Sequence, residues 1–176
     1  MAELERGAGR VEGSRAGRPV PQALLVLLVC AAVYWPRLGA DGFLSSEGHR
    51  VIPAWGMLDS GEFGVPRLFE QVYLRKPPGF YWAIAGSSAV FGRTEFAARA
   101  VSAGAMTAGA LLSFWFARRW FGRVDPRAGV YAGLAHALSP WFWQIGRVAE
   151  IVPWYVHDAL VHWLAPRGRC RSQWWQ

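Results

Sequence analysis

Three stretches of the chain are apolar over lengths that are typical of membrane-spanning helices. Residues 20–36 and 128–146 contain no charged side chain, and residues 96–117 contain only Arg99, which can snorkel to the membrane surface. A spanning helix needs roughly 20 mainly apolar residues. These stretches therefore predict three spans. A shorter fourth stretch, residues 151–165, is interpreted as a further span.

Residues 77–92 are also uncharged, but they favour a helix that lies on the membrane. The helix-competent part of about 14 residues would be about 21 Å long, against a hydrocarbon core of about 30 Å. Arginines cluster before the first span and after the second, and both clusters favour the cytoplasmic side only if residues 77–92 do not cross. The clusters consist of Arg6, Arg10, Arg15, Arg18, Arg118, Arg119, Arg123 and Arg127. We therefore expect an interfacial helix over 79–92, with Tyr81 and Trp82 at headgroup level.

The fold class predicted is an all-α integral membrane protein with about four transmembrane helices and an external loop that carries interfacial helices. Residues 1–18 are expected to form a cytoplasmic tail, 19–165 the membrane domain with its external loop at 37–95, and 166–176 a basic cytoplasmic tail. The first span resembles a signal peptide, but its long leader of mixed charge and the later spans favour an uncleaved anchor. We expect a multi-pass protein of the cell (inner) membrane with its N-terminus in the cytoplasm.

The external loop has its own helical periodicity. Apolar side chains recur at helical spacing at Val51, Trp55 and Leu58. Ser45 and Ser46 are candidate N-cap residues, and Pro53 predicts a kink or a restart of the helix. The polar run at residues 59–62 predicts its end.

Composition supports a membrane protein and argues against some other classes. The chain is 53% hydrophobic with eleven Trp, and its formal net charge is +7. The arginines lie at the ends of apolar runs rather than on one basic face, which argues against nucleic-acid binding. Cys30 and Cys170 have no metal-ligand spacing and are not expected to form a disulfide.

Lys76 is the only lysine of the chain, and it lies between Arg75 and two prolines. Pro77 and Pro78 favour an extended, stiff backbone at this point. Two adjacent cations on such a backbone can hold a phosphate, or they can form a charge pair that flanks the membrane.

Several motifs, in this order and spacing, resemble the N-terminal part of polytopic GT-C glycosyltransferases, in particular the aminoarabinose-transferase and protein-O-mannosyltransferase group. The motifs are Ser46-Glu47-Gly48-His49-Arg50, residues 57–63 and 65–68, Tyr73-Leu74-Arg75-Lys76-Pro77-Pro78, Tyr81-Trp82 and residues 91–99. The resemblance covers about residues 20–155. It implies that a sugar is transferred from a polyprenyl-phosphate donor to a lipid or protein acceptor on the outer side of the membrane.

The resemblance also implies roles for individual residues. Lys76 would contact the donor phosphate, with Tyr73 beside it as a hydrogen-bond donor. Arg75 replaces a residue that is often acidic in the family, and it either adds phosphate affinity or faces lipid headgroups. These three residues would form the donor-phosphate site.

The catalytic carboxylates implied by the resemblance are Glu47 and Glu150. Family members carry an Asp-Glu pair where this chain has Ser46 and Glu47, so either Glu47 takes the role of general base or the loop is inactive. Simpler structural roles are a helix-capping carboxylate for Glu47 and an ion pair between Glu150 and Arg147 at helical spacing.

No cofactor is assigned, although a divalent metal is possible because His49 lies near Glu47. The other candidate ligands match no standard metal-site spacing. They are His136, His157, Asp158 and His162.

Two other functions stay open at this point. The family needs more helices than this chain contains, so the chain is expected to be a fragment or a truncated form that is incomplete alone. The alternative is a non-catalytic small multi-pass membrane protein, or an inactive remnant, that binds lipid phosphate or a partner. A transporter fragment is disfavoured because the chain has no inverted repeat.

Overall fold

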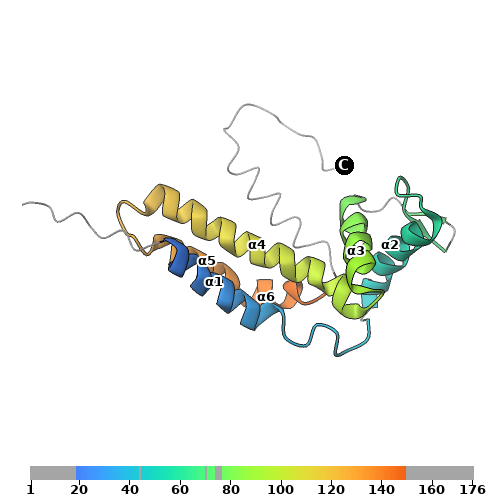
Figure 1. Ribbon diagram of the computed structural model, residues 1–176, viewed down its shortest axis with the longest axis horizontal. Coiled ribbons are helices and arrows are strands. Elements are labelled where there is room, and N and C mark those ends of the chain that lie inside the picture. Colours follow the sequence, from blue (N-terminus) through green and yellow to red (C-terminus); the bar gives the residue numbers. More distant parts are fainter. Residues whose placement is uncertain (1–18, 44, 70, 74–76, 150–176) are drawn as a thin grey trace, which may run out of the picture.

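The structure is a computed structural model that describes residues 19–43, 45–69, 71–73 and 77–149 (Figure 1). This part is all-α apart from one small hairpin, as predicted. Its elements are α1 (Pro19–Tyr34), η1 (Ser45–Glu47, a 3-10 turn), α2 (Gly48–Ser60), β1 (Arg67–Leu68), β2 (Gln71–Val72), α3 (Gly79–Phe91), α4 (Glu95–Phe121), α5 (Ala128–Ala137) and α6 (Pro140–Gly146). The antiparallel strands pair Arg67 with Val72.

The helices form two packed groups that meet at the N-terminal end of α4. Helices α1, α5 and α6 lie along α4, whereas α2 and α3 pack together beside its first turns (Figure 1). The core of the bundle includes Tyr34 of α1 and Met106 and Phe114 of α4. The second group buries Met57 of α2 and Ile84 of α3. Burial of these apolar side chains is the main force that holds both groups together.

Both ends of helix α4 are well terminated. The Thr94 side chain accepts a hydrogen bond from the Ala97 N–H at 3.1 Å, and Arg118 and Arg119 lie in the last turn, where they complement the helix dipole. Within the described residues, α4 is the single helix long and apolar enough to cross a membrane. Helix α1 is apolar but has 16 residues.

The predicted span over residues 128–146 is not one continuous helix. It is broken between α5 and α6, where Ser139 has an extended backbone (φ −61°, ψ 123°) and Pro140 begins α6. Proline disfavours the helical conformation of the residue before it and is well suited to the first position of a helix. The sequence run is apolar throughout, but Pro140 divides it.

The helices of the loop were predicted in part. Helix α3 matches the expected helix at 79–92 closely, and α2 ends at Ser60 with Gly61 in the left-handed conformation (φ 71°). Helix α2 runs through Pro53, so the predicted restart is wrong; α2 tolerates this proline, which is itself buried. The N-cap residue is Glu47 rather than a serine, because residues 45–47 already form the preceding 3-10 turn.

The start of α1 and the end of α4 lie together, at the end of the bundle remote from α2 and α3 (Figure 1). The Arg118 Nη1 donates to the Gln22 Oε1 at 2.7 Å, and the Gln22 Nε2 donates to the Pro126 carbonyl at 3.5 Å. The first helix therefore begins beside the arginine-rich loop after α4. The 45–91 segment occupies the opposite end.

The close approach of α4 and α5 gives a stability test. A Cβ atom at Gly129 would lie 2.8 Å from the Phe114 carbonyl oxygen, so Gly129→Ala must separate the two helices. We expect a loss of about 1–3 kcal/mol in the free energy of unfolding, measured by thermal unfolding in one detergent. Gly104→Ala in α4 is the matched control, because a Cβ there meets nothing within 4 Å. Equal melting temperatures for the two variants would contradict this packing.

Candidate functional site

Glu47 is held in a buried ion pair with Arg99. The Arg99 Nε donates to the Glu47 Oε1 at 2.9 Å, and the Arg99 Nη2 donates to the Glu47 Oε2 at 2.8 Å. The two side chains are 2% and 5% exposed. The expected snorkelling of Arg99 is therefore wrong, because the guanidinium turns inward to a buried carboxylate. A bidentate pair of this kind is strong and fixes the geometry of both groups.

The remaining Arg99 donors bind the backbone of the loop between α1 and η1. Nη1 donates to the carbonyls of Leu38 and Asp41 at 2.8 and 2.9 Å, and Nη2 donates to the Gly42 carbonyl at 2.9 Å. These bonds and the two to Glu47 use all five N–H groups of a guanidinium. Arg99 thus ties the loop before the site to the first turns of α4.

Glu47 also binds the segment that follows α6. Its Oε1 accepts a hydrogen bond from the Ala149 N–H at 2.7 Å. Glu150 lies outside the described residues, but its sequence neighbour is held at Glu47. Arg147 donates to the carbonyls of Val33 and Pro36 at 3.3 and 2.9 Å, near the C-terminus of α1. The carboxylate of Glu47 thus binds α4 through Arg99 and the segment after α6 through Ala149, and its side chain does not cap α2.

The candidate phosphate-binding residues are described only in part. Tyr73 is half-buried, donates its N–H to the Pro66 carbonyl at 2.8 Å, and packs against the core between α2 and α3. Lys76 and Arg75 lie outside the described residues. The structure therefore places Tyr73 at the α2–α3 end of the molecule, where Glu47 also lies.

Tyr81 and Trp82 differ in their surroundings, although both were expected at headgroup level. Trp82 is 49% exposed, and its Nε1 donates to the Phe63 carbonyl at 2.7 Å. Tyr81 is fully buried, among the core residues of α2 and α3. A helix places adjacent residues on different faces, so only Trp82 can meet the surface.

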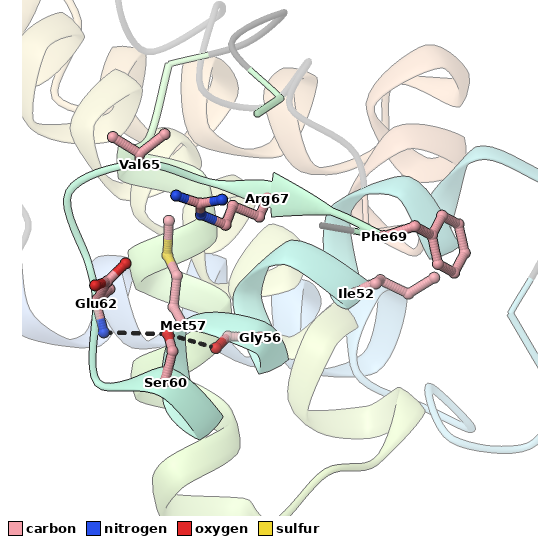
Figure 2. Close-up of a pocket in the computed structure, with 8 residues that line it drawn as sticks. All are labelled: Ile52, Gly56, Met57, Ser60, Glu62, Val65, Arg67 and Phe69. Carbon is pink, nitrogen blue, oxygen red and sulfur yellow. Dashed lines mark hydrogen bonds between the residues drawn. The ribbon is translucent and has the colours of Figure 1, made fainter. Parts of the chain in front are cut away.

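A groove lies between α2 and the β1 strand (Figure 2). It has a volume of about 440 Å³. Ile52 and Phe69 form one end of it, and Ser60, Glu62 and Val65 lie toward the other end (Figure 2). The Glu62 N–H donates a hydrogen bond to the Ser60 Oγ at 3.2 Å. Among the described residues, neither Glu47 nor Tyr73 lines the groove.

A second ion pair joins α2 to the turn before α4, and it is exposed. The Arg93 Nη1 donates to the Asp59 Oδ2 at 3.2 Å, and the Arg93 Nη2 binds the other carboxylate oxygen. The hydrogen bond from Arg93 lowers the pKa of Asp59. Exposed pairs of this kind contribute little to stability.

In the part of the chain that the structure describes, no three His, Cys, Asp or Glu side chains are grouped as a metal site would require. His49 is exposed. The two residues that sequence reasoning missed are Arg99, as the partner of Glu47, and Tyr81, as a buried hydroxyl. The only sequence signal for Arg99 was a lone charge within an apolar run, which is costly in a membrane unless it is paired.

The two arginine–carboxylate pairs allow a matched test. We expect Arg99→Gln to lower the free energy of unfolding by about 3–5 kcal/mol, because it leaves a buried carboxylate unpaired. Arg93→Gln removes an exposed pair of similar geometry and should have a much smaller effect.

The double variant Glu47→Gln/Arg99→Gln should lose less stability than the summed losses of Glu47→Gln and Arg99→Gln. The difference should be about 0.5–3 kcal/mol. Thermal or denaturant unfolding in detergent measures all four proteins. Additive losses would show that Glu47 and Arg99 do not interact.

The chain is similar to several bacterial proteins. It is 31% identical over 149 residues, 77% of this chain, to the undecaprenyl phosphate-alpha-4-amino-4-deoxy-L-arabinose arabinosyl transferase of Pseudomonas paraeruginosa. It is 43% identical over 61 residues to the Aeromonas hydrophila transferase of the same name, and 32% identical over 100 residues to an uncharacterized protein of Aquifex aeolicus. It spans 27%, 11% and 20% of the length of these three relatives. No solved structure matches the chain.

A protein family described as dolichyl-phosphate-mannose-protein mannosyltransferase matches residues 75–175. The match covers more than half of the chain and includes the Lys76 motif. It agrees with the arabinosyl transferase of Pseudomonas paraeruginosa, which matches over most of the chain's length. The predicted resemblance is confirmed: the chain belongs to the dolichyl-phosphate-mannose-protein mannosyltransferase family, within the GT-C glycosyltransferase group.

Proposed function

We propose that the chain forms part of a membrane glycosyltransferase that transfers a sugar from a polyprenyl-phosphate donor to a lipid or protein acceptor. Family membership supports the reaction class. The observation that carries the proposal is the Glu47 carboxylate, which is held beside Ala149 at the end of the molecule where Tyr73 lies. The retained acidic residue of the family motif is thus joined to the residue before the second candidate, Glu150.

In this proposal the two carboxylates have different tasks. Glu47 is buried and its carboxylate is engaged by Arg99 and Ala149, so an acceptor cannot reach it in this arrangement. We assign it the task of positioning the backbone at residue 149. Glu150 is the candidate general base, which removes a proton from the acceptor hydroxyl or amine. Lys76, with Arg75 and Tyr73, stabilises the negative charge of the leaving phosphate.

The proposal places the site on the outer face of the inner membrane, with the N-terminus in the cytoplasm and several spanning helices. Its support is the position of α1, which begins beside the arginine-rich loop after α4, whereas α2 and α3 lie at the opposite end. Short basic loops favour the cytoplasm. Helices α5 and α6 together, and the residues at 151–165, would supply the other crossings.

The second candidate function is a non-catalytic membrane protein that binds lipid phosphate, and one observation favours it. Ser46 occupies the position at which the resemblance implies an Asp. Loss of that carboxylate would leave phosphate binding intact and remove one catalytic group. Binding and transfer therefore need separate tests.

The binding test compares undecaprenyl phosphate with undecaprenol, using the full chain in lipid nanodiscs. We expect the phosphate lipid to bind more tightly, and Lys76→Ala to weaken its binding about 10–100-fold, because a hydrogen bond to a charged group is lost. Lys76→Arg should keep most of the affinity. Arg119→Ala, an exposed cation at the other end of α4, is the control. Equal affinities of Lys76→Ala and the unchanged chain would remove the phosphate role of Lys76.

The transfer test uses a chimera in which this chain replaces the matching segment of the Pseudomonas paraeruginosa transferase. Consumption of the lipid-linked sugar donor is measured. We expect Glu150→Gln to lower the rate about 10²–10⁴-fold, the range for loss of an acid–base group. Folding of each variant is checked by its melting temperature.

The same chimera separates the two candidate functions. A chimera that is inactive as it stands and active with Ser46→Asp would show that this chain is a remnant that lost its carboxylate. Full activity of Glu150→Gln would exclude Glu150 as the base.

A further inference from the structure

A pocket lies at the end of the bundle remote from α2 and α3, where the chain turns from α4 into the loop before α5 (Figure 1). Its volume is about 340 Å³, which suits a small ligand group. Three of its lining residues are arginines, and we call it the basic pocket. The full lining consists of Trp115, Arg118, Arg119, Gly122, Arg123 and Pro126. The basic pocket therefore combines positive charge with apolar walls.

Gln22 of α1 holds two walls of the basic pocket. Its Oε1 accepts a hydrogen bond from the Arg118 Nη1 at 2.7 Å, and its Nε2 donates to the Pro126 carbonyl at 3.5 Å. The end of α4 and the loop that follows it are thus tied to the same side chain. The Arg118 guanidinium is already engaged at Gln22, so Arg118 shapes the wall and adds positive charge to it.

Arg119 and Arg123 supply donors that the described part of the protein does not use. Both side chains are exposed, and neither guanidinium makes a hydrogen bond or an ion pair with another residue that the structure describes. The nearest carboxylate in the sequence is Asp125, whose Oδ1 accepts the Arg127 N–H at 2.8 Å. The other described acidic residues all lie between residues 41 and 95, in the loops and helices around the start of α4. The end of the molecule that holds the basic pocket is therefore positive and favours an anion.

An exposed apolar strip on α4 leads to the basic pocket. The strip consists of Ala108, Leu112 and Trp115, all of them exposed and three or four residues apart. Arg119 follows Trp115 by four residues, so the same helix face ends in a cation. Helix α4 is also long and apolar enough to cross a membrane. An acyl chain that ends in a phosphate group has the same order of properties, whereas a free anion would use only the cation.

We propose that the basic pocket binds the head group of an anionic phospholipid. The guanidinium groups of Arg119 and Arg123 donate to the phosphate oxygens, and one acyl chain lies along Leu112 and Trp115. Basic pockets at the cytoplasmic ends of membrane helices suit such head groups. In the orientation proposed above, this lipid belongs to the cytoplasmic leaflet. The site is distinct from the donor-phosphate site, because Tyr73 lies at the opposite end of the molecule.

The first test measures lipid binding to the full chain in a non-ionic detergent, by native mass spectrometry. Phosphatidylglycerol, which is anionic, is compared with zwitterionic phosphatidylcholine that has the same acyl chains. We expect phosphatidylglycerol to bind about tenfold more tightly, because its head group carries a net charge that the arginines neutralise. Equal affinities for the two lipids would overturn the inference.

The second test locates the binding. Arg123→Ala should weaken the binding of phosphatidylglycerol about tenfold, because a hydrogen bond to a charged group is lost, and Arg123→Lys should keep part of the affinity. Arg127→Ala is the matched control, because it removes the same charge from the same loop but does not line the pocket. We expect Arg127→Ala to weaken binding by less than about threefold. Equal effects of Arg123→Ala and Arg127→Ala would indicate diffuse surface attraction and contradict a specific site.

Glycerol phosphate separates a lipid from a free phosphate group as the ligand. It carries the charge and lacks the acyl chains, so we expect it to displace phosphatidylglycerol only at a much higher concentration. Displacement at an equal concentration would show that the apolar strip is not used. The site would then bind a soluble phosphate, and its assignment to a lipid would be wrong.

This inference goes beyond the proposed function, and the two can fail separately. In a nanodisc that contains phosphatidylglycerol, bulk lipid fills the basic pocket, so Arg123→Ala should not change the binding of undecaprenyl phosphate. Lys76→Ala should leave the binding of phosphatidylglycerol unchanged. If either variant weakens the binding of both lipids equally, the two sites are not distinct and the inference is overturned. Absence of phosphatidylglycerol binding would overturn the inference alone, and absence of undecaprenyl phosphate binding would overturn the proposed function alone.

Discussion

The buried pair of Glu47 and Arg99 organises the end of the molecule where the family's motifs gather. Taking two charges out of water is costly, and only good geometry with further hydrogen bonds offsets that cost. Here the Arg99 donors go to Glu47 and to three loop carbonyls, while Glu47 also holds the Ala149 N–H. One ion pair therefore fixes the loop after α1, the start of α2, the first turns of α4 and the segment after α6. Apolar packing then holds α3 against α2 and the first turns of α4.

Much of the secondary structure could be predicted, because it depends on local chemistry. Apolar runs gave α1 and α4, the length of the uncharged run before Gly92 gave α3, and the polar run at 59–62 gave the end of α2. The break before Pro140 also has a local cause, because proline disfavours the helical conformation of Ser139, although the uncharged run predicts one continuous helix. The pairing of Glu47 with Arg99 was not readable, because it joins residues 52 positions apart. The burial of Tyr81 next to an exposed Trp82 likewise depends on how α3 packs.

The structure changes how the family's acidic motif is understood in this chain. The resemblance implies that Glu47 is the retained member of a catalytic Asp-Glu pair and that Ser46 stands in the place of the Asp. In the function proposed above it has a supporting role, since a carboxylate enclosed by Arg99 and a backbone N–H has little access to an acceptor. Glu150 is the residue to which that proposal assigns proton transfer.

The contacts of Glu47 also set an order in which the chain can fold during its synthesis. A ribosome makes Glu47 long before Arg99, and Ala149 lies 102 residues after Glu47. Until α4 emerges, the carboxylate has no arginine to neutralise it and favours water over a packed interior. The Glu47 carboxylate therefore meets all its described partners only after residue 149 has been synthesised.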